Sequence, residues 1–174
     1  MAIPTVEHEV NELMNKLPER YLVAGYRLDS GDDGILRTVA TRLAQYVDED
    51  ALISGRAPGR VAASTVYLSR LLAMPGSEPS QEQIAEESGT SQRTVRKSYS
   101  DVAELARTRL ERGEAIEGDR LDAFLLVRLR VFFRSGGHPA ITGRLKDSLL
   151  NDLELVYDDQ VDYETIVDDP EAGR

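Results

Sequence analysis

Apolar residues recur at intervals of three and four along most of this chain, which places them on one face of an α-helix. Four such stripes are clear: Val6, Val10, Leu13, Met14 and Leu17; Leu36, Val39, Ala40, Leu43 and Val47; Val95, Tyr99, Val102 and Ala106; and Ile141, Leu145, Leu149, Leu153 and Val156. Residues 21–28 form an apolar run that could also be a strand, but the helical periodicity downstream favours a short helix. The pattern therefore predicts an all-α fold.

One predicted helix, within residues 55–74, is small or apolar on nearly all sides. It starts after a Pro-Gly turn and ends at Pro75-Gly76. A helix that lacks a polar face belongs in the middle of a bundle, where its alanines and serines let neighbours approach closely. We expect it to place these residues in or beside the core: Val61, Ala62, Thr65, Leu68 and Leu72.

Residues 80–110 have the spacing of two helices joined by a tight turn. Ala85 is small enough for close helix packing, Gly89 suits a turn that needs a positive φ, and Val95 faces back into the angle. Ser80 and Ser91 are good N-cap residues, and Glu82 and Gln92 add hydrogen-bonding groups in the first turns. This pattern predicts a helix-turn-helix.

The second of these helices carries Arg93, Arg96 and Lys97 on the face opposite its apolar stripe. A recognition helix has this arrangement, because its N-terminal residues enter the major groove of DNA. A solvated helix face would look the same. Arg56 and Arg60, at the start of the central helix, could bind phosphate, but Arg56 could equally pair with a carboxylate.

The chain has a net charge of -10, whereas DNA-binding proteins are usually basic. The distribution is uneven: residues 51–109 contain eight basic and six acidic residues, and residues 147–171 contain ten acidic residues and no basic one. Arginine also outnumbers lysine, 18 to 3. Excess acid with little lysine is typical of a halophilic source, in which surface acid serves solubility in salt.

Other kinds of function have little support in the residues. The chain has no cysteine and two isolated histidines, His8 and His138, so we expect no metal site. No phosphate-binding loop, dinucleotide fingerprint or catalytic triad is present, and we expect no enzyme activity and no cofactor. No apolar run could span a membrane, and the acidic N-terminus is unlike a signal peptide. We expect a cytoplasmic protein.

Two blocks resemble a known family. DALISGRAPGRVAASTVYLSRLL resembles the Gly-Arg-Ser-Pro turn and alanine-rich third helix of a cyclin repeat in archaeal transcription factor B and general transcription factor IIB, and SQEQIAEESGTSQRTVRKSYSDV resembles the last two helices. The order and spacing match the second repeat, over residues 19–109. This resemblance implies a five-helix cyclin-like bundle ending in a helix-turn-helix that contacts promoter DNA, with TATA-binding protein as a further partner.

The resemblance also implies a set of DNA-contacting residues: Ser91, Gln92, Arg93, Thr94, Arg96 and Lys97, with Arg56 and Arg60 beside them. Thr94, Val95, Arg96 and Tyr99 agree with the pattern of that helix, while Arg93 stands where the family usually has a small or apolar residue. The cysteine zinc ribbon that recruits RNA polymerase in the complete factor has no counterpart in these residues, so the resemblance does not extend to polymerase recruitment.

These observations predict four regions: a packing helix in 1–17, the cyclin-like domain in 18–112, extra C-terminal helices in 113–156, and an acidic tail in 157–174 that we expect to be disordered. The extra helices, which include the very apolar residues 121–133, take the place of the missing repeat, form a homodimer interface through residues 121–156, or add a layer to the core. A second functional hypothesis remains open, in which the chain is a cyclin-box interaction adaptor whose acidity prevents DNA binding.

Overall fold

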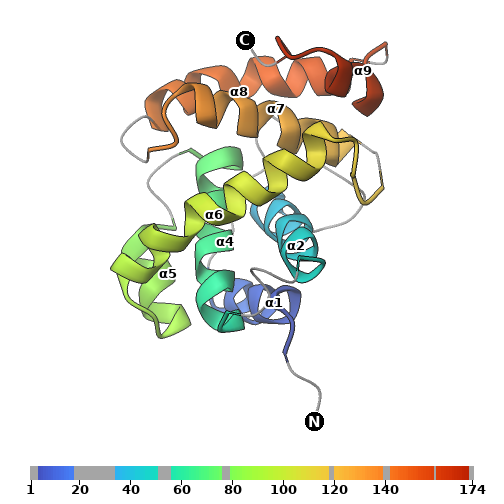
Figure 1. Cartoon of the computed structure of the whole chain (residues 1–174). Helices are drawn as coiled ribbons and strands as arrows, with labels where there is room; N and C mark the ends of the chain where they lie inside the picture. The colour runs from blue at the N-terminus through green and yellow to red at the C-terminus, as the bar shows by residue number, and fades with distance from the viewer. Residues whose placement is uncertain are drawn as a thin grey trace.

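The computed structural model describes residues 4–17, 34–50, 56–75, 79–117, 120–138, 142–158 and 160–172, and every regular element in these residues is a helix (Figure 1). The predicted all-α fold is confirmed. The helix expected at 21–28 lies outside the described residues. The helices are α1 (Val6–Lys16), α2 (Ile35–Asp48), α4 (Pro58–Ala73), α5 (Gln81–Ser88), α6 (Gln92–Glu111), α7 (Arg120–Arg134), α8 (Thr142–Tyr157) and α9 (Tyr163–Asp168).

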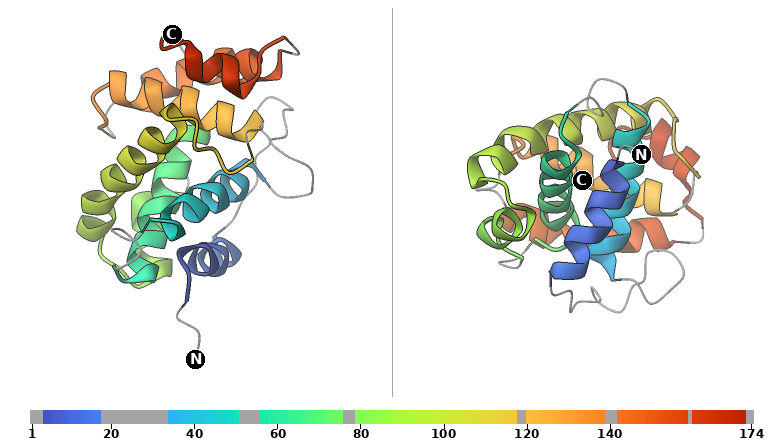
Figure 2. Two further views of the ribbon diagram at one scale, coloured as in Figure 1. Left: turned by 45° about the vertical axis from the view of Figure 1, so that its right-hand side comes forward. Right: turned by 90° about the horizontal axis from the view of Figure 1, so that it is seen from below.

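Helix α4 is the centre of the cyclin-like bundle, with α1, α2, α5 and α6 packed around it (Figures 1 and 2). Every side chain from Val61 to Ala73 is buried, which confirms the predicted core residues of this helix. Its buried hydroxyls are satisfied at short range: Thr65 donates to the Val61 carbonyl, and Ser64 reaches the Val95 carbonyl of α6 at 3.2 Å. Small residues thus bring α4 and α6 together.

Helix α1 is part of this bundle. All four apolar residues of its stripe that fall within the helix are buried, as the periodicity predicted. Its N-terminus is tied to α2, because the Asp48 carboxylate accepts hydrogen bonds from the backbone N–H groups of Val6 and Glu7 at 2.8 and 3.0 Å. We predicted a boundary between regions after residue 17. Residues on both sides of it belong to the same hydrophobic core, whose members lie between Val6 and Ala172.

Helices α7 and α8 lie across one end of the bundle (Figure 1). Helix α7 packs on α4 and α6 and is covered by α8 and α9, so its side chains from Leu121 to Phe132 are all buried. The stripe of α8 is buried too, at Leu145, Leu149, Leu153 and Val156. The extra helices therefore add a layer to the core.

Two arginines interrupt the apolar sequence of α7, and both are buried with their hydrogen bonds satisfied. Arg128 is fully buried and donates to the carbonyls of Leu72 and Leu145, to Ser148 and to Asp152. Burial lowers the pKa of Arg128 and raises the pKa of Asp152, and their mutual attraction opposes both shifts. This arginine joins the end of α4 to α7 and α8.

The expectation of a disordered tail is wrong. Residues 160–172 contain α9, which begins at an Asp162 N-cap and buries Tyr163 and Ile166, and Ala172 is buried beyond it. Arg130 donates to the carbonyls of Ile166 and Asp169 at 2.8 and 2.6 Å. The acidic side chains of this segment stay in water, while a few apolar groups and backbone carbonyls bind α7. Composition alone could not show that.

Candidate nucleic-acid interface

The first helix of the predicted helix-turn-helix is α5, and its ends are set by local hydrogen bonds. Ser80 accepts from the backbone N–H of Gln83, and the Gln83 side chain accepts in return from the backbone N–H of Ser80, which forms a capping box. Ser80 is thus the N-cap that we expected, and Gln83 is its partner. Gly89 ends α5 in the left-handed region at φ 68°.

The second helix starts directly after the turn. Ser91 caps α6, because its Oγ accepts from the Thr94 backbone N–H at 3.1 Å and lies 2.9 Å from the Thr94 hydroxyl. The fully buried Val95 holds this first turn against α4. Ser91 and Thr94, both predicted to contact DNA, therefore also form the N-cap of α6. Gln92, between them, is exposed.

Three cations lie on the first two turns of α6. Arg93, Arg96 and Lys97 are all exposed, and none of them has a hydrogen bond or ion pair within the described part of the chain. Their donors are therefore available to a ligand. The partial positive charge of the helix N-terminus adds to the attraction for anions at the same place.

The two arginines near the start of α4 differ from each other. Arg56 forms an ion pair with Asp101 of α6 at 2.8 Å, with both side chains 48% exposed. Of its two predicted roles, the structure shows the carboxylate partner. Arg60, one turn further into α4, is exposed and forms no side-chain interaction with the described residues. Arg60 is therefore available to a ligand, as the α6 cations are.

The buried face of α6 contacts both the central helix α4 and the added helix α7. Tyr99 packs edge-on against Tyr67 of α4 and Phe132 of α7, with ring centroids 5.4 and 6.1 Å apart. Its hydroxyl donates to the Gly137 carbonyl at 2.9 Å. The apolar stripe predicted Tyr99 in the core, but its link to the turn after α7 could not be read from the sequence. A helix held at so many points presents its basic turns in a fixed orientation.

After these turns α6 carries both signs of charge, because Arg107, Arg109 and the C-cap Arg112 lie among its acidic residues. Asp101, Glu104 and Glu111 follow, and each is paired with an arginine. The exposed face of α5 is acidic as well, at Glu82, Glu86 and Glu87. The cationic surface is therefore small and bordered by acid, so an anionic ligand has to approach the N-terminal end of α6.

We also searched the described residues for a metal site and for a membrane-spanning helix. Within them, no three histidine or acidic side chains are arranged to hold a metal ion. No described helix is both long enough and apolar enough to cross a lipid bilayer.

Three relatives share a region of sequence with this chain. They are proteins named transcription initiation factor IIB from Methanoregula boonei, Methanoculleus marisnigri and Methanosphaerula palustris, each 34% identical over 71 residues. Part of this chain is related to transcription initiation factor IIB. The shared region covers 41% of this chain and 20 to 21% of each relative, so the chain spans about a fifth of the length of the curated relatives it matches. No family model and no solved structure matches the chain.

Proposed function

We propose that this protein is a DNA-binding transcription factor that places the N-terminal turns of α6 in the major groove of promoter DNA. The observation that carries the proposal is the set of three exposed cations, Arg93, Arg96 and Lys97, at the start of the second helix of a helix-turn-helix. The similarity to transcription initiation factor IIB supports a role in transcription.

The three cations have separate roles in this proposal. Arg96 and Lys97 are adjacent in sequence but about 100° apart around the helix, so they reach different targets. The planar guanidinium of Arg96 donates two parallel hydrogen bonds to a guanine edge, whereas the compact ammonium of Lys97 suits a phosphate. Arg93, one turn before Lys97, adds a base or phosphate contact, and Arg60 adds a phosphate contact from α4.

The surrounding acid limits how the protein docks. The first helix of a helix-turn-helix crosses the DNA backbone, yet the exposed face of α5 carries Glu82, Glu86 and Glu87. These carboxylates would repel phosphates, so α5 has to tilt away while the tip of α6 leads. With few cations in contact, non-specific affinity is low and specificity depends on base contacts.

Two partner questions follow from the same proposal. We propose TATA-binding protein as a partner on the promoter, because of the partial similarity to transcription initiation factor IIB. The acidic face of α5 favours a second candidate, a cyclin-like adaptor that binds protein and does not bind DNA. Gel-shift assays with and without TATA-binding protein distinguish three cases: DNA binding that TATA-binding protein strengthens, DNA binding by this protein alone, and the adaptor, which gives no shift.

The test of DNA reading is a set of salt titrations by fluorescence anisotropy. A duplex selected from a random pool and a scrambled duplex are each titrated with the parent chain and with Arg96→Ala and Lys97→Ala. Arg112→Ala is the matched control, because Arg112 is an exposed arginine at the other end of α6. Arg96→Ala should cost about 1 to 3 kcal/mol on the selected duplex and much less on the scrambled one.

Lys97→Ala should weaken binding to both duplexes alike and reduce the salt slope by about one phosphate contact. Arg112→Ala should change neither quantity. If Arg96→Ala binds both duplexes as the parent does, α6 does not read DNA. The adaptor is then the better account of the protein.

A further inference from the structure

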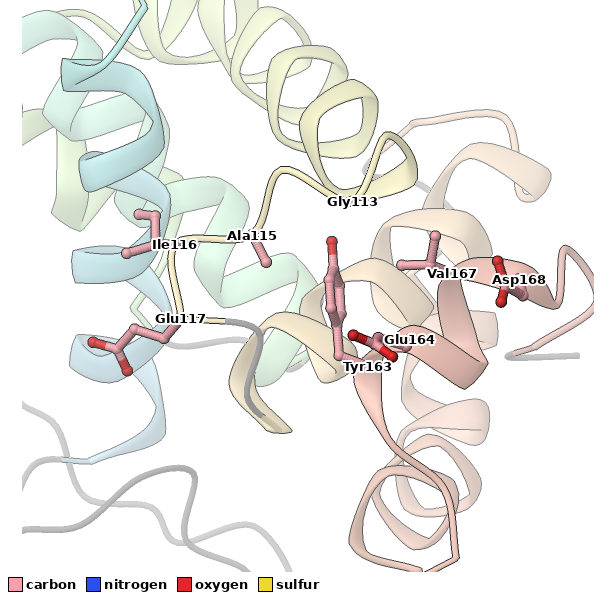
Figure 3. Close-up of a pocket in the computed structure, with 8 residues that line it drawn as sticks. All are labelled: Gly113, Ala115, Ile116, Glu117, Tyr163, Glu164, Val167 and Asp168. Atoms are coloured by element: carbon pink, nitrogen blue, oxygen red, sulfur yellow. The ribbon is translucent and has the colours of Figure 1, made fainter.

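A cavity of about 570 Å³ lies at the far end of α6 from the basic turns, between residues 113–117 and α9 (Figure 3). An α-helix rises 1.5 Å per residue, so the 20 residues of α6 separate the two ends by about 30 Å. The cavity has no part in the proposed DNA contact. Its walls come from two segments that the sequence separates by about fifty residues.

The lining of this cavity is mixed, and its apolar part is partly exposed. Ala115 and Ile116 line one side and Val167 the other, and all three are half-buried against the core. Between them stands the ring of Tyr163, whose hydroxyl points toward Gly113 at the end of α6 and donates to the Leu110 carbonyl at 2.7 Å (Figure 3). That hydrogen bond and the burial of the ring hold this wall in place. An apolar surface of this kind gains free energy when a second apolar group covers it.

The polar groups around this wall are acidic. Glu117 lies on one side, and Glu164 and Asp168 lie on the other side, one helical turn apart on α9 (Figure 3). Glu164 and Asp168 are exposed and form no side-chain interaction with the described residues, whereas Glu117 pairs with Arg42 at 3.3 Å and is still 62% exposed. Three carboxylates beside one opening attract cations and repel phosphate.

We propose that this cavity binds a basic peptide segment of a protein partner, with one apolar side chain against Tyr163, Ile116 and Val167 and flanking arginines or lysines on Glu164 and Asp168. Charge complementarity selects this occupant, since nucleic acid would be repelled by the same carboxylates. The protein then holds DNA at one end of α6 and a basic protein segment at the other. The inference does not depend on the DNA proposal, because the two surfaces share no residue.

The experiment uses the full chain and three synthetic peptides with a fluorescent label. The first peptide is Lys-Arg-Leu-Arg-Lys, the second has serine in place of leucine, and the third is Glu-Asp-Leu-Asp-Glu. The test variant is Glu164→Lys with Asp168→Lys. The matched control is Asp147→Lys with Glu154→Lys, which changes the net charge equally on the exposed face of α8.

The parent should bind the leucine peptide, bind the serine peptide several-fold more weakly and not bind the acidic peptide. The test variant should lose at least about tenfold in affinity for the leucine peptide, and the control less than about twofold. Circular dichroism checks that both variants fold, and the milder pair Glu164→Gln with Asp168→Asn replaces the test variant if it does not.

Three results would overturn the proposal. Equal losses in the test and control variants would mean that net charge alone attracts the peptide. Equal binding of the leucine and serine peptides would mean that the apolar wall is not used. No binding of the leucine peptide at millimolar concentration would remove the site altogether. Failure of this proposal does not affect the DNA proposal, because the DNA titrations are a separate measurement. The test and control double variants should have equal affinity for DNA.

Discussion

Helices α6 and α7 are both rich in arginine, and the arginines in the middle of α7 differ in environment from those at the start of α6. On α7, Arg128 and Arg130 are buried, and their guanidinium groups are surrounded by carbonyls and carboxylates. On the first turns of α6, Arg93 and Arg96 are exposed and have no partner in the described residues. Arginine therefore stabilises the fold on α7, whereas on the first turns of α6 it is available to a ligand.

This difference separates the arginines that hold the fold together from those that we propose contact DNA. A buried guanidinium has to be matched by acceptors on every side, because an unsatisfied charge in the interior costs several kcal/mol. Arg128 meets that condition with four acceptors from α4 and α8. An arginine with all its donors occupied has none left for DNA.

Replacing Arg128 with methionine should destabilise the fold by about 3 to 5 kcal/mol, because it leaves Asp152 buried without its partner. Urea denaturation monitored by circular dichroism measures the change. The double variant Arg128→Met with Asp152→Leu is the control, since removing both charges should restore much of the stability. An unchanged urea midpoint for Arg128→Met would mean that this ion pair does not hold α7 and α8 together.

Replacing Ile166 with alanine should cost about 2 to 5 kcal/mol, because its side chain is 1% exposed and truncation leaves a cavity in the core. Thermal and urea unfolding measure this effect. Glu164→Ala on the same helix is the control, and it should change stability by less than about 0.5 kcal/mol. Equal stability of the two variants would show that α9 does not contribute to the fold.

Ionisation of Tyr163 should lower the stability of the fold at alkaline pH. Burial, together with Asp122 and Glu114, raises the pKa of Tyr163 to about 12, against the smaller opposing effect of Arg130. Above pH 10 the unfolded chain loses the phenolic proton while the folded chain keeps it, so stability falls as pH rises from 10 to 12.

Tyr163→Phe should make that fall shallower by up to about 1.4 kcal/mol per pH unit, the value for one proton. Urea midpoints measured from pH 8 to pH 12 give the two slopes. The parent and the variant should have parallel slopes below pH 9, which is the internal control. Parallel slopes up to pH 12 would mean that the tyrosine ionises equally in both states.

Replacing Arg93 or Arg96 with alanine should change the free energy of unfolding by less than about 0.5 kcal/mol, because both side chains are exposed and unpaired within the described residues. The same urea titrations measure it, with Arg128→Met as the contrasting variant. A loss of several kcal/mol for Arg96→Ala would place this arginine among the structural residues and weaken its assignment to DNA.

The local features of the candidate interface could be predicted from sequence. Ser80, Gly89 and Ser91 set the ends of α5 and α6 through hydrogen bonds and dihedral angles that involve only nearby residues. The capping box of α5 was not predicted, although Gln83 stands three residues after Ser80, the position that such a box needs. The role of Arg56 remained open, since its partner Asp101 is 45 residues away and only folding brings the two together.

The sequence by itself determined the helical class, the central position of α4, the buried stripes and the exposed cations of α6. These depend on the period of apolar residues, which is a local property of the chain. Only the tertiary structure decided that α9 folds, that Arg128 and Arg130 are structural, and that an acidic cavity forms beside Tyr163. Each of these requires groups far apart in sequence to meet, and neither composition nor periodicity contains that information.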